Sequence, residues 1–146
     1  HAEFRGKCVF ADCAFEKKAS FWEARFATWV DFKNCVFAAE ADFRTVTCDQ
    51  GFVLTRSTFR GDFLFRGACV EKKFQADGSR FEKLLDVSKA KLHDFAYLEA
   101  IEAGPAQSFA FLNAVAERIR VRPDQVAGRL ASELDGRHED AMQEYG

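Results

Sequence analysis

Large apolar residues, most of them phenylalanine, recur along this chain at alternating steps of five and six, so the pattern has a period of 11. One series consists of Phe10, Phe21, Phe32, Phe43, Leu54, Phe65, Ala76, Val87 and Leu98. A second, interleaved series consists of Phe4, Phe15, Phe26, Phe37, Cys48, Phe59, Val70, Phe81 and Leu92. Because apolar positions of an α-helix recur near every 3.6 residues, the pattern excludes a helix from residue 2 to about residue 98.

A second, usually smaller residue precedes these positions by two, as Cys13 precedes Phe15. A separation of two is the strand period, so both residues point to one side, while the residue between, such as Asp31, Asp42 or Arg80, points to water. Units this short bury little surface alone and must stack on their neighbours. A meander of hairpins would need longer strands and regular turn signals such as Asn-Gly, which are absent.

Each unit therefore reads as small, variable and large, as in the segments CVFADCAF (8–15), ASFWEARF (19–26), VDFKNCVF (30–37) and ADFRTVTC (41–48). These segments resemble pentapeptide-repeat proteins, in the variant with a sixth residue after every second unit. The resemblance implies an all-β solenoid: a right-handed quadrilateral β-helix with one unit per side, so that each coil takes two periods of 11. We expect about four coils, in a repeat domain that covers residues 1–100.

A coil period of 22 predicts which side chains stack along the axis. One predicted column consists of Phe15, Phe37, Phe59 and Phe81, and the column of their small partners consists of Cys13, Cys35, Ser57 and Ser79. Where the small position is large, its partner tends to shrink, which conserves core volume. Phe63 with Phe65 departs from this trend, so we expect that coil to widen, shift register or turn one ring outward.

The five cysteines, at positions 8, 13, 35, 48 and 69, include no CxxC pair, which favours reduced thiols. Four occupy inward positions and are expected to act as compact apolar filler. A disulfide between Cys13 and Cys35 is the alternative, because they stack in neighbouring coils. Cys69 faces outward, as an inert surface cysteine or a reactive thiol.

Beyond about residue 100 the period stops, and we expect residues 101–146 to form a short α-helical cap. Leu112, Val115 and Ile119 follow helical spacing, and a second helix is expected from Pro123 to Gly136. A solenoid needs its last coil covered, so capping is one role for this segment, and a homodimer interface is the other.

The N-terminus already obeys the repeat, since Ala2 and Phe4 fit the first unit. We therefore expect a module of a larger bacterial-type protein, or an end covered by a second subunit. No apolar run is long enough to span a bilayer, so membrane insertion is not expected, and the reduced cysteines favour a cytoplasmic location.

No active site is predicted. The three histidines, His1, His93 and His138, show no metal-ligand spacing, and His93 with Asp94 is interpreted as a solvated corner. No phosphate-binding loop or paired carboxylates occur. We therefore expect no catalytic residue, no metal and no cofactor.

Binding is the remaining function, with two hypotheses. Some pentapeptide-repeat proteins mimic DNA and bind gyrase, which requires a strongly acidic surface, but residues 44–98 carry ten Lys or Arg against seven Asp or Glu. The favoured hypothesis is a non-catalytic protein-interaction module. Trp22 and Trp29 are expected near one corner of the first coils, either as hot-spot residues or packed against an upstream segment or a second subunit. Four arginines could contact nucleic acid, which the balanced net charge of −2 disfavours. The candidate partner-binding residues are Trp22, Trp29, Arg44, Arg56, Arg60 and Arg66.

Overall fold

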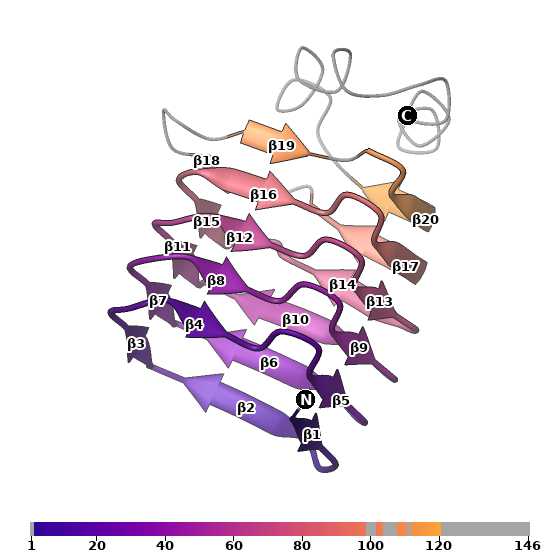
Figure 1. Cartoon of the computed structure of the whole chain (residues 1–146), viewed down its shortest axis with the longest axis horizontal. Coiled ribbons are helices and arrows are strands. Elements are labelled where there is room, and N and C mark those ends of the chain that lie inside the picture. Colours follow the sequence, from indigo (N-terminus) through magenta and orange to yellow (C-terminus); the bar gives the residue numbers. More distant parts are fainter. Residues whose placement is uncertain (1, 99–101, 104–107, 111, 121–146) are drawn as a thin grey trace.

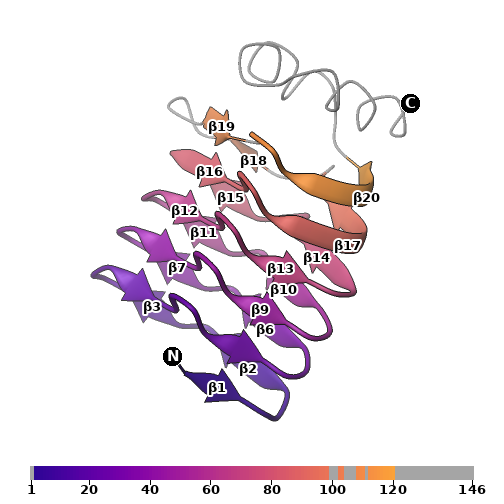
Figure 2. The ribbon, with the colours of Figure 1, turned by 45° about the vertical axis from the view of Figure 1, so that its right-hand side comes forward.

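The computed structural model describes residues 2–98, 102–103, 108–110 and 112–120. These residues form an all-β parallel solenoid of about five turns, with no helix among them (Figure 1). Successive turns stack along one axis, and β1 and β2 lie at the opposite end from β19 and β20 (Figures 1 and 2).

Each turn contributes one strand to each of four sides. The first side holds β1 (Glu3–Phe4), β5 (Arg25–Phe26), β9 (Thr47–Cys48), β13 (Cys69–Val70) and the start of β17 (Lys91–Tyr97). The second side holds β2 (Cys8–Ala11), β6 (Val30–Lys33), β10 (Phe52–Thr55), β14 (Lys73–Gln75) and the end of β17. The third side holds β3 (Ala14–Phe15), β7 (Val36–Phe37), β11 (Thr58–Phe59), β15 (Arg80–Phe81) and β18 (Glu102–Ala103). The fourth side holds β4 (Ala19–Ser20), β8 (Ala41–Asp42), β12 (Phe63–Leu64), β16 (Leu84–Asp86) and β19 (Ser108–Ala110). The last strand, β20 (Val115–Arg120), pairs with β17.

The strand pairs confirm the predicted coil period of 22. Phe37 pairs in parallel with Phe15 in one neighbouring turn and with Phe59 in the other. The predicted ring column is also confirmed, because successive rings from Phe15 to Phe81 stack with centroids 4.5, 4.7 and 5.1 Å apart and interplanar angles of 8°, 12° and 6°. Burial of these rings and their offset stacking stabilise each turn on the next.

The other three sides carry shorter stacks of the same kind. Their stacked ring pairs are Phe4 with Phe26, Phe10 with Phe32, Phe52 with Phe74, and Phe21 with Phe43. Rings from adjacent sides meet edge to face inside the coil, as Phe59 meets Phe63 at 4.8 Å and 76°. The core is therefore a stack of phenylalanine layers enclosed by four narrow sides, of which the first and second are joined into one sheet by β17.

Phe63 and Phe65 both remain inside, fully buried, and Phe63 keeps the regular register with Ala41 and Leu85. The expected register shift or outward ring is therefore wrong. Ala41, which pairs with Phe63 from the turn before, is small and leaves room beside this ring. The turn that holds Phe63 has the smaller Cys48 at the large position of its first side. The two large rings of this unit are therefore balanced by small residues in the same coil and in the neighbouring one, so that the core stays closely packed.

The alternation of five and six residues has a backbone cause. Eight residues at intervals of 11 have positive φ and lie at the five-residue corners: Asp12, Glu23, Asn34, Thr45, Arg56, Gly67, Gly78 and Lys89. These corners turn tightly, with hydrogen bonds such as Ala24 N–H to Phe21 O. Among the six-residue corners described, only that of Asp94, where the pairing of β17 shifts register, contains a positive φ. At the other six-residue corners, the additional residue lets the chain turn without a left-handed conformation.

The helix expected around Leu112, Val115 and Ile119 is wrong, because Val115–Arg120 is strand β20. Leu112 and Val115 are 46% and 50% exposed, whereas Ala114 and Ala116 pack against the core. The sequence does not show the strand alternation here, because small alanines take inward positions and the larger Leu112 and Val115 face outward. The pairing offset also grows from 22 at Phe81↔Ala103 to 24 at Leu85↔Phe109, which ends the period of 11.

The coils therefore continue past residue 100, which gives about five turns where we expected about four. The second expected helix, from Pro123 to Gly136, and the homodimer interface assigned to it lie outside the described residues. In the part of the chain that is described, no helix has the length and apolar character of a membrane span.

Candidate functional sites: a corner ridge and a cysteine–glutamate–histidine cluster

Three of the candidate partner-binding residues form one line along the corner between the fourth and first sides. Trp22, Arg44 and Arg66 occupy equivalent positions in three successive turns, and the backbone N–H groups of Glu23 and Thr45 donate to the carbonyls of Arg44 (3.1 Å) and Arg66 (2.9 Å). Trp22 is 51% exposed and both arginines are exposed. We call Trp22, Arg44 and Arg66 the corner ridge.

Arg44 is held in place by Asp42. Its Nε and Nη2 donate to the two carboxylate oxygens at 2.9 and 2.8 Å, and Lys18 Nζ lies 3.9 Å from Oδ2. The expectation that Asp42 points to water is wrong, since these cations cover its side chain to 2% exposure. Burial opposes ionisation of Asp42, but the hydrogen bonds and charge of Arg44 outweigh it and lower the pKa of this carboxyl.

Trp29 does not belong to the corner ridge. Trp22 precedes β5 and Trp29 follows it, so the two lie at opposite ends of one strand and the expected shared corner is wrong. The half-buried Trp29 ring occupies the space beside Gly51 that a side chain would fill, and Lys73 Nζ lies 5.4 Å from its centroid. Trp29 therefore packs across its neighbouring turns.

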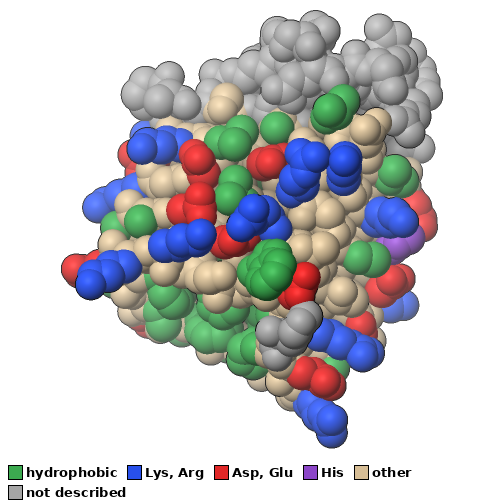
Figure 3. Space-filling model, viewed as in Figure 1, with side chains coloured by type: hydrophobic (Ala, Val, Ile, Leu, Met, Phe, Trp, Pro, Cys, Tyr) green, Lys and Arg blue, Asp and Glu red, His purple; other side chains and the backbone are tan. Residues whose placement is uncertain are grey.

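The remaining two arginines lie elsewhere. Arg56 and Arg60 are exposed at the two ends of β11 on the third side, and Arg60 Nε is 3.9 Å from a carboxylate oxygen of Glu82. Figure 3 shows basic and acidic side chains interspersed over the face it presents. The four arginines thus do not form the continuous basic strip that a nucleic-acid backbone requires.

The cysteines that face inward act as core filler, and all five thiols are free. Cys35 donates from Sγ to the Phe10 carbonyl at 3.1 Å, and its own N–H donates to the Ser57 hydroxyl at 3.1 Å. Ser57 Oγ donates in turn to Phe32 O at 2.8 Å, so the small-residue column satisfies backbone groups of adjacent turns. Burial strongly raises the pKa of Cys48, which keeps that thiol protonated and inert.

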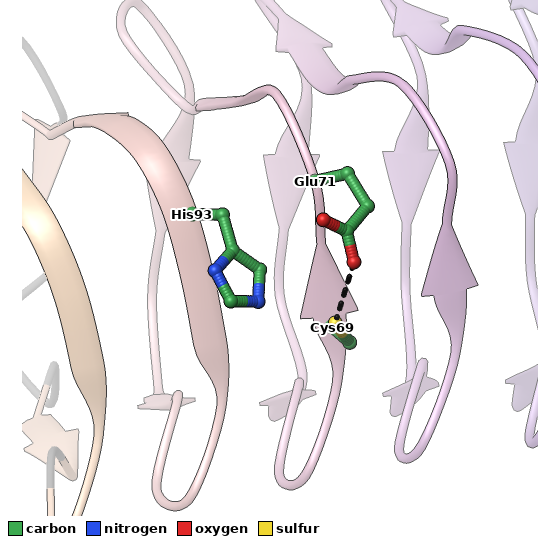
Figure 4. A group of neighbouring side chains, drawn as sticks. All are labelled: Cys69, Glu71 and His93. Carbon is green, nitrogen blue, oxygen red and sulfur yellow. Dashed lines mark hydrogen bonds between the residues drawn. The ribbon is translucent and has the colours of Figure 1, made fainter.

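The structure also brings together three residues with metal-ligating side chains on the first side. Cys69 begins β13 and Glu71 directly follows it, and His93 lies on β17 in the next turn (Figure 4). One ligand atom from each lies within 4.8 Å of the others. The Cys69 thiol donates to Glu71 Oε1 at 3.5 Å, and His93 Nδ1 is 3.8 Å from Glu117 Oε1 on β20.

The environment of Cys69 is electrostatically mixed. Partial burial, followed by the hydrogen bond and negative charge of Glu71, raises the pKa of the Cys69 thiol, while Lys91 opposes the shift. Cys69 is half-buried, and Glu71 is exposed. Glu71 therefore favours the protonated form of this thiol.

The cluster shows no metal-ligand spacing along the chain, because its residues come from two different coils. In a solenoid, side chains one coil apart are neighbours, and His93 follows Glu71 by one coil period. Adding one coil period to a residue number identifies the phenylalanine column, and it also identifies Glu71 and His93 when it is applied to outward positions.

A family model described as pentapeptide repeats (9 copies) matches residues 1–47. The match confirms the resemblance noted in the sequence, and the strand pairing continues the same register through Ala103. No curated protein and no solved structure gives a match.

Proposed function

We propose that this chain, whose coils are built from pentapeptide repeats, is a non-catalytic scaffold that binds a protein partner along the corner ridge of Trp22, Arg44 and Arg66. The observation that carries the proposal is the alignment of these residues on one rigid edge. Tryptophan and arginine are the residue types most enriched among binding hot spots, and they are most effective when clustered.

The ridge is preorganised for binding. Its three residues follow consecutive turns whose backbones are hydrogen-bonded to one another, and the bidentate contact with Asp42 already orders the Arg44 guanidinium. Because Arg44 loses little freedom when it meets a partner, more of its interaction energy is retained as affinity. The flat sides next to the ridge offer a surface of fixed shape.

The charge distribution favours a protein partner over DNA mimicry or nucleic-acid binding. Acidic side chains are paired with basic ones in neighbouring turns, as Lys18 Nζ is 2.9 Å from Glu40 and Arg25 Nη2 is 2.7 Å from Asp49. A DNA mimic that binds gyrase needs a continuous acidic surface, and these pairs interrupt one. A polar surface of mixed sign is typical of protein interfaces.

The proposal is tested by affinity capture with wild type, a Trp22→Ala, Arg66→Ala double variant, and a Val9→Ala control. Val9 is 49% exposed on β2, away from the ridge, so it reports non-specific apolar binding. Partners recovered with wild type and the control should be lost from the double variant. Equal recovery with all three proteins would refute the ridge as the binding surface.

The same capture distinguishes the alternatives. If the recovered partner were nucleic acid, binding would weaken steeply with salt, because displaced counterions drive that association. If it were gyrase, an acidic face would carry the contact, and the double variant would retain it. Either result would replace the present proposal.

A further inference from the structure

We propose that Cys69, Glu71 and His93 form a binding site for one divalent transition-metal ion, for which zinc is the best match. This site lies on the outer surface of the first side and is independent of the corner ridge. The inference rests on the ligand types and on their convergence from two adjacent turns.

The donor set selects the class of metal. A thiolate, an imidazole and a carboxylate are the three ligand types that zinc uses in proteins, at about 2.0 to 2.3 Å. Calcium and magnesium take oxygen ligands, and only one of the three residues supplies oxygen. Soft sulfur and nitrogen donors favour zinc and its neighbours in the first transition row.

The geometry is close to what a tetrahedral ion requires. Ligand atoms around such an ion are separated by roughly 3.3 to 3.8 Å, given those bond lengths. Cys69 Sγ and Glu71 Oε1 are already 3.5 Å apart, and all three ligand atoms lie within 4.8 Å of one another. The proposal requires rotation of the exposed Glu71 side chain and of the His93 ring to close the remaining gap.

The backbone fixes the positions from which these side chains project. Val70 pairs with Leu92 across β13 and β17, and Glu71 N–H donates to Cys48 O at 3.0 Å in the turn before. The Cys69 and His93 side chains therefore start from neighbouring, hydrogen-bonded strands. Metal binding would link these two turns without moving either strand.

A carboxylate from a third turn lies beside the histidine. Glu117 on β20 approaches His93 Nδ1 at 3.8 Å. Figure 4 shows one ring nitrogen turned toward Cys69 and Glu71 and the other turned away, so Nε2 is the nitrogen that faces the site. A carboxylate on the distal nitrogen is the usual support of a metal-ligating histidine, because it fixes the ring and its tautomer.

Three protein ligands leave a fourth position of a tetrahedral ion open. Water fills such a position in many zinc proteins. The site accordingly has the ligand number of an exchangeable centre and lies at the surface, where a ligand from solution can reach it. No reaction is assigned to it.

The test uses Co²⁺ as a spectroscopic substitute for zinc, added to the full chain under reducing conditions. Thiolate coordination gives a cobalt charge-transfer absorption band, and tetrahedral geometry gives intense visible bands. We expect one Co²⁺ per chain with both signatures, and displacement of the cobalt by Zn²⁺. Cys69→Ser should abolish the charge-transfer band, and His93→Gln should weaken binding of both ions.

Cys8→Ser is the matched control, because Cys8 is another partly buried thiol on a different side of the solenoid. It should bind cobalt as wild type does. Glu117→Gln should weaken zinc binding about 10- to 100-fold, as removal of an outer carboxylate does elsewhere. Far-ultraviolet circular dichroism of each variant verifies that the coils remain folded.

Two outcomes would overturn the proposal. One is cobalt binding without a thiolate band in wild type, which would assign the ion to other residues. The other is a thiolate band that persists in Cys69→Ser. Because none of these variants touches the corner ridge, either outcome leaves the proposed partner binding to stand or fall by the capture experiment.

Discussion

Removal of one ring from the middle of the phenylalanine column is the most direct test of how this solenoid is stabilised. Phe59 is fully buried, and its ring lies between Phe37 at 4.7 Å and Phe81 at 5.1 Å. A third ring, Phe63, meets it edge to face at 4.8 Å. Phe59→Ala removes all three contacts.

The magnitude follows from the buried area and the rigidity of the surroundings. A buried phenylalanine removes roughly 150 to 250 Å² from water, which at about 25 cal/mol per Å² is worth some 4 to 6 kcal/mol before alanine's share is subtracted. Strand pairing of β11 with β7 and β15 prevents the cavity from collapsing. We expect a loss of about 4 kcal/mol, within the usual range of about 3 to 5 for such a change.

Equilibrium urea unfolding, followed by circular dichroism, measures this loss if the slope of free energy against denaturant is unchanged. Phe59→Leu is the companion variant: it keeps most of the apolar volume and should cost about 1 to 2 kcal/mol. Phe15→Ala, at a half-buried ring of the same column, should cost less than Phe59→Ala. A loss below about 1 kcal/mol for Phe59→Ala would refute the buried-column reasoning.

Two further predictions concern a left-handed corner residue and a buried carboxylate. Thr45 has a φ of 58°, which is costly for a β-branched residue, so Thr45→Gly should stabilise the chain by about 1 kcal/mol in thermal or urea unfolding; the strand residue Thr47 changed to Gly should have the opposite effect, and stabilisation by both would contradict the explanation. The pKa of Asp42 is lowered on folding from its ordinary value of 3.8, so its charge contributes stability that is complete above about pH 4 and disappears as the pH falls through the lower folded pKa. Asp42→Asn should lack this part of the acid dependence, and an unchanged slope of stability against pH below 4 would argue against the role assigned to the Arg44 pair.

The 11-residue repeat was predictable from strand alternation and spacing alone, whereas the four sides, and with them the coil period of 22, followed from the resemblance to pentapeptide-repeat proteins. Phe37 follows Phe15 by one coil period in the chain and therefore by one turn in space. Once the resemblance sets the coil at two periods, counting alone places these two rings in one column. The same period, applied to outward residues, would have paired Glu71 with His93.

Other features depend on interactions that no period encodes. Asp42 is buried because Lys18 and Arg44 reach over it, and long side chains can do so from several positions. β20 escaped prediction because Ala114 and Ala116 carry no more apolar signal than a helix or loop would. The corner ridge could not be predicted because the sequence does not show that Trp22 is exposed whereas Trp29 packs against the coil. Trp29 packs because Gly51, one turn away, has no side chain and leaves room for its ring.

The two kinds of corner differ in how well they tolerate an inserted or deleted residue. A five-residue corner depends on one left-handed residue, and an added residue there would rotate every following inward position to the outside. The offset between paired residues of neighbouring turns grows from 22 to 24 between Ala103 and Ser108, which is the place of a six-residue corner. After this step, a left-handed residue again occurs, at Asn113. Variation in length is therefore absorbed at alternate edges of the solenoid, so new loops can be added along two of its four edges while the stacked interior stays as it is.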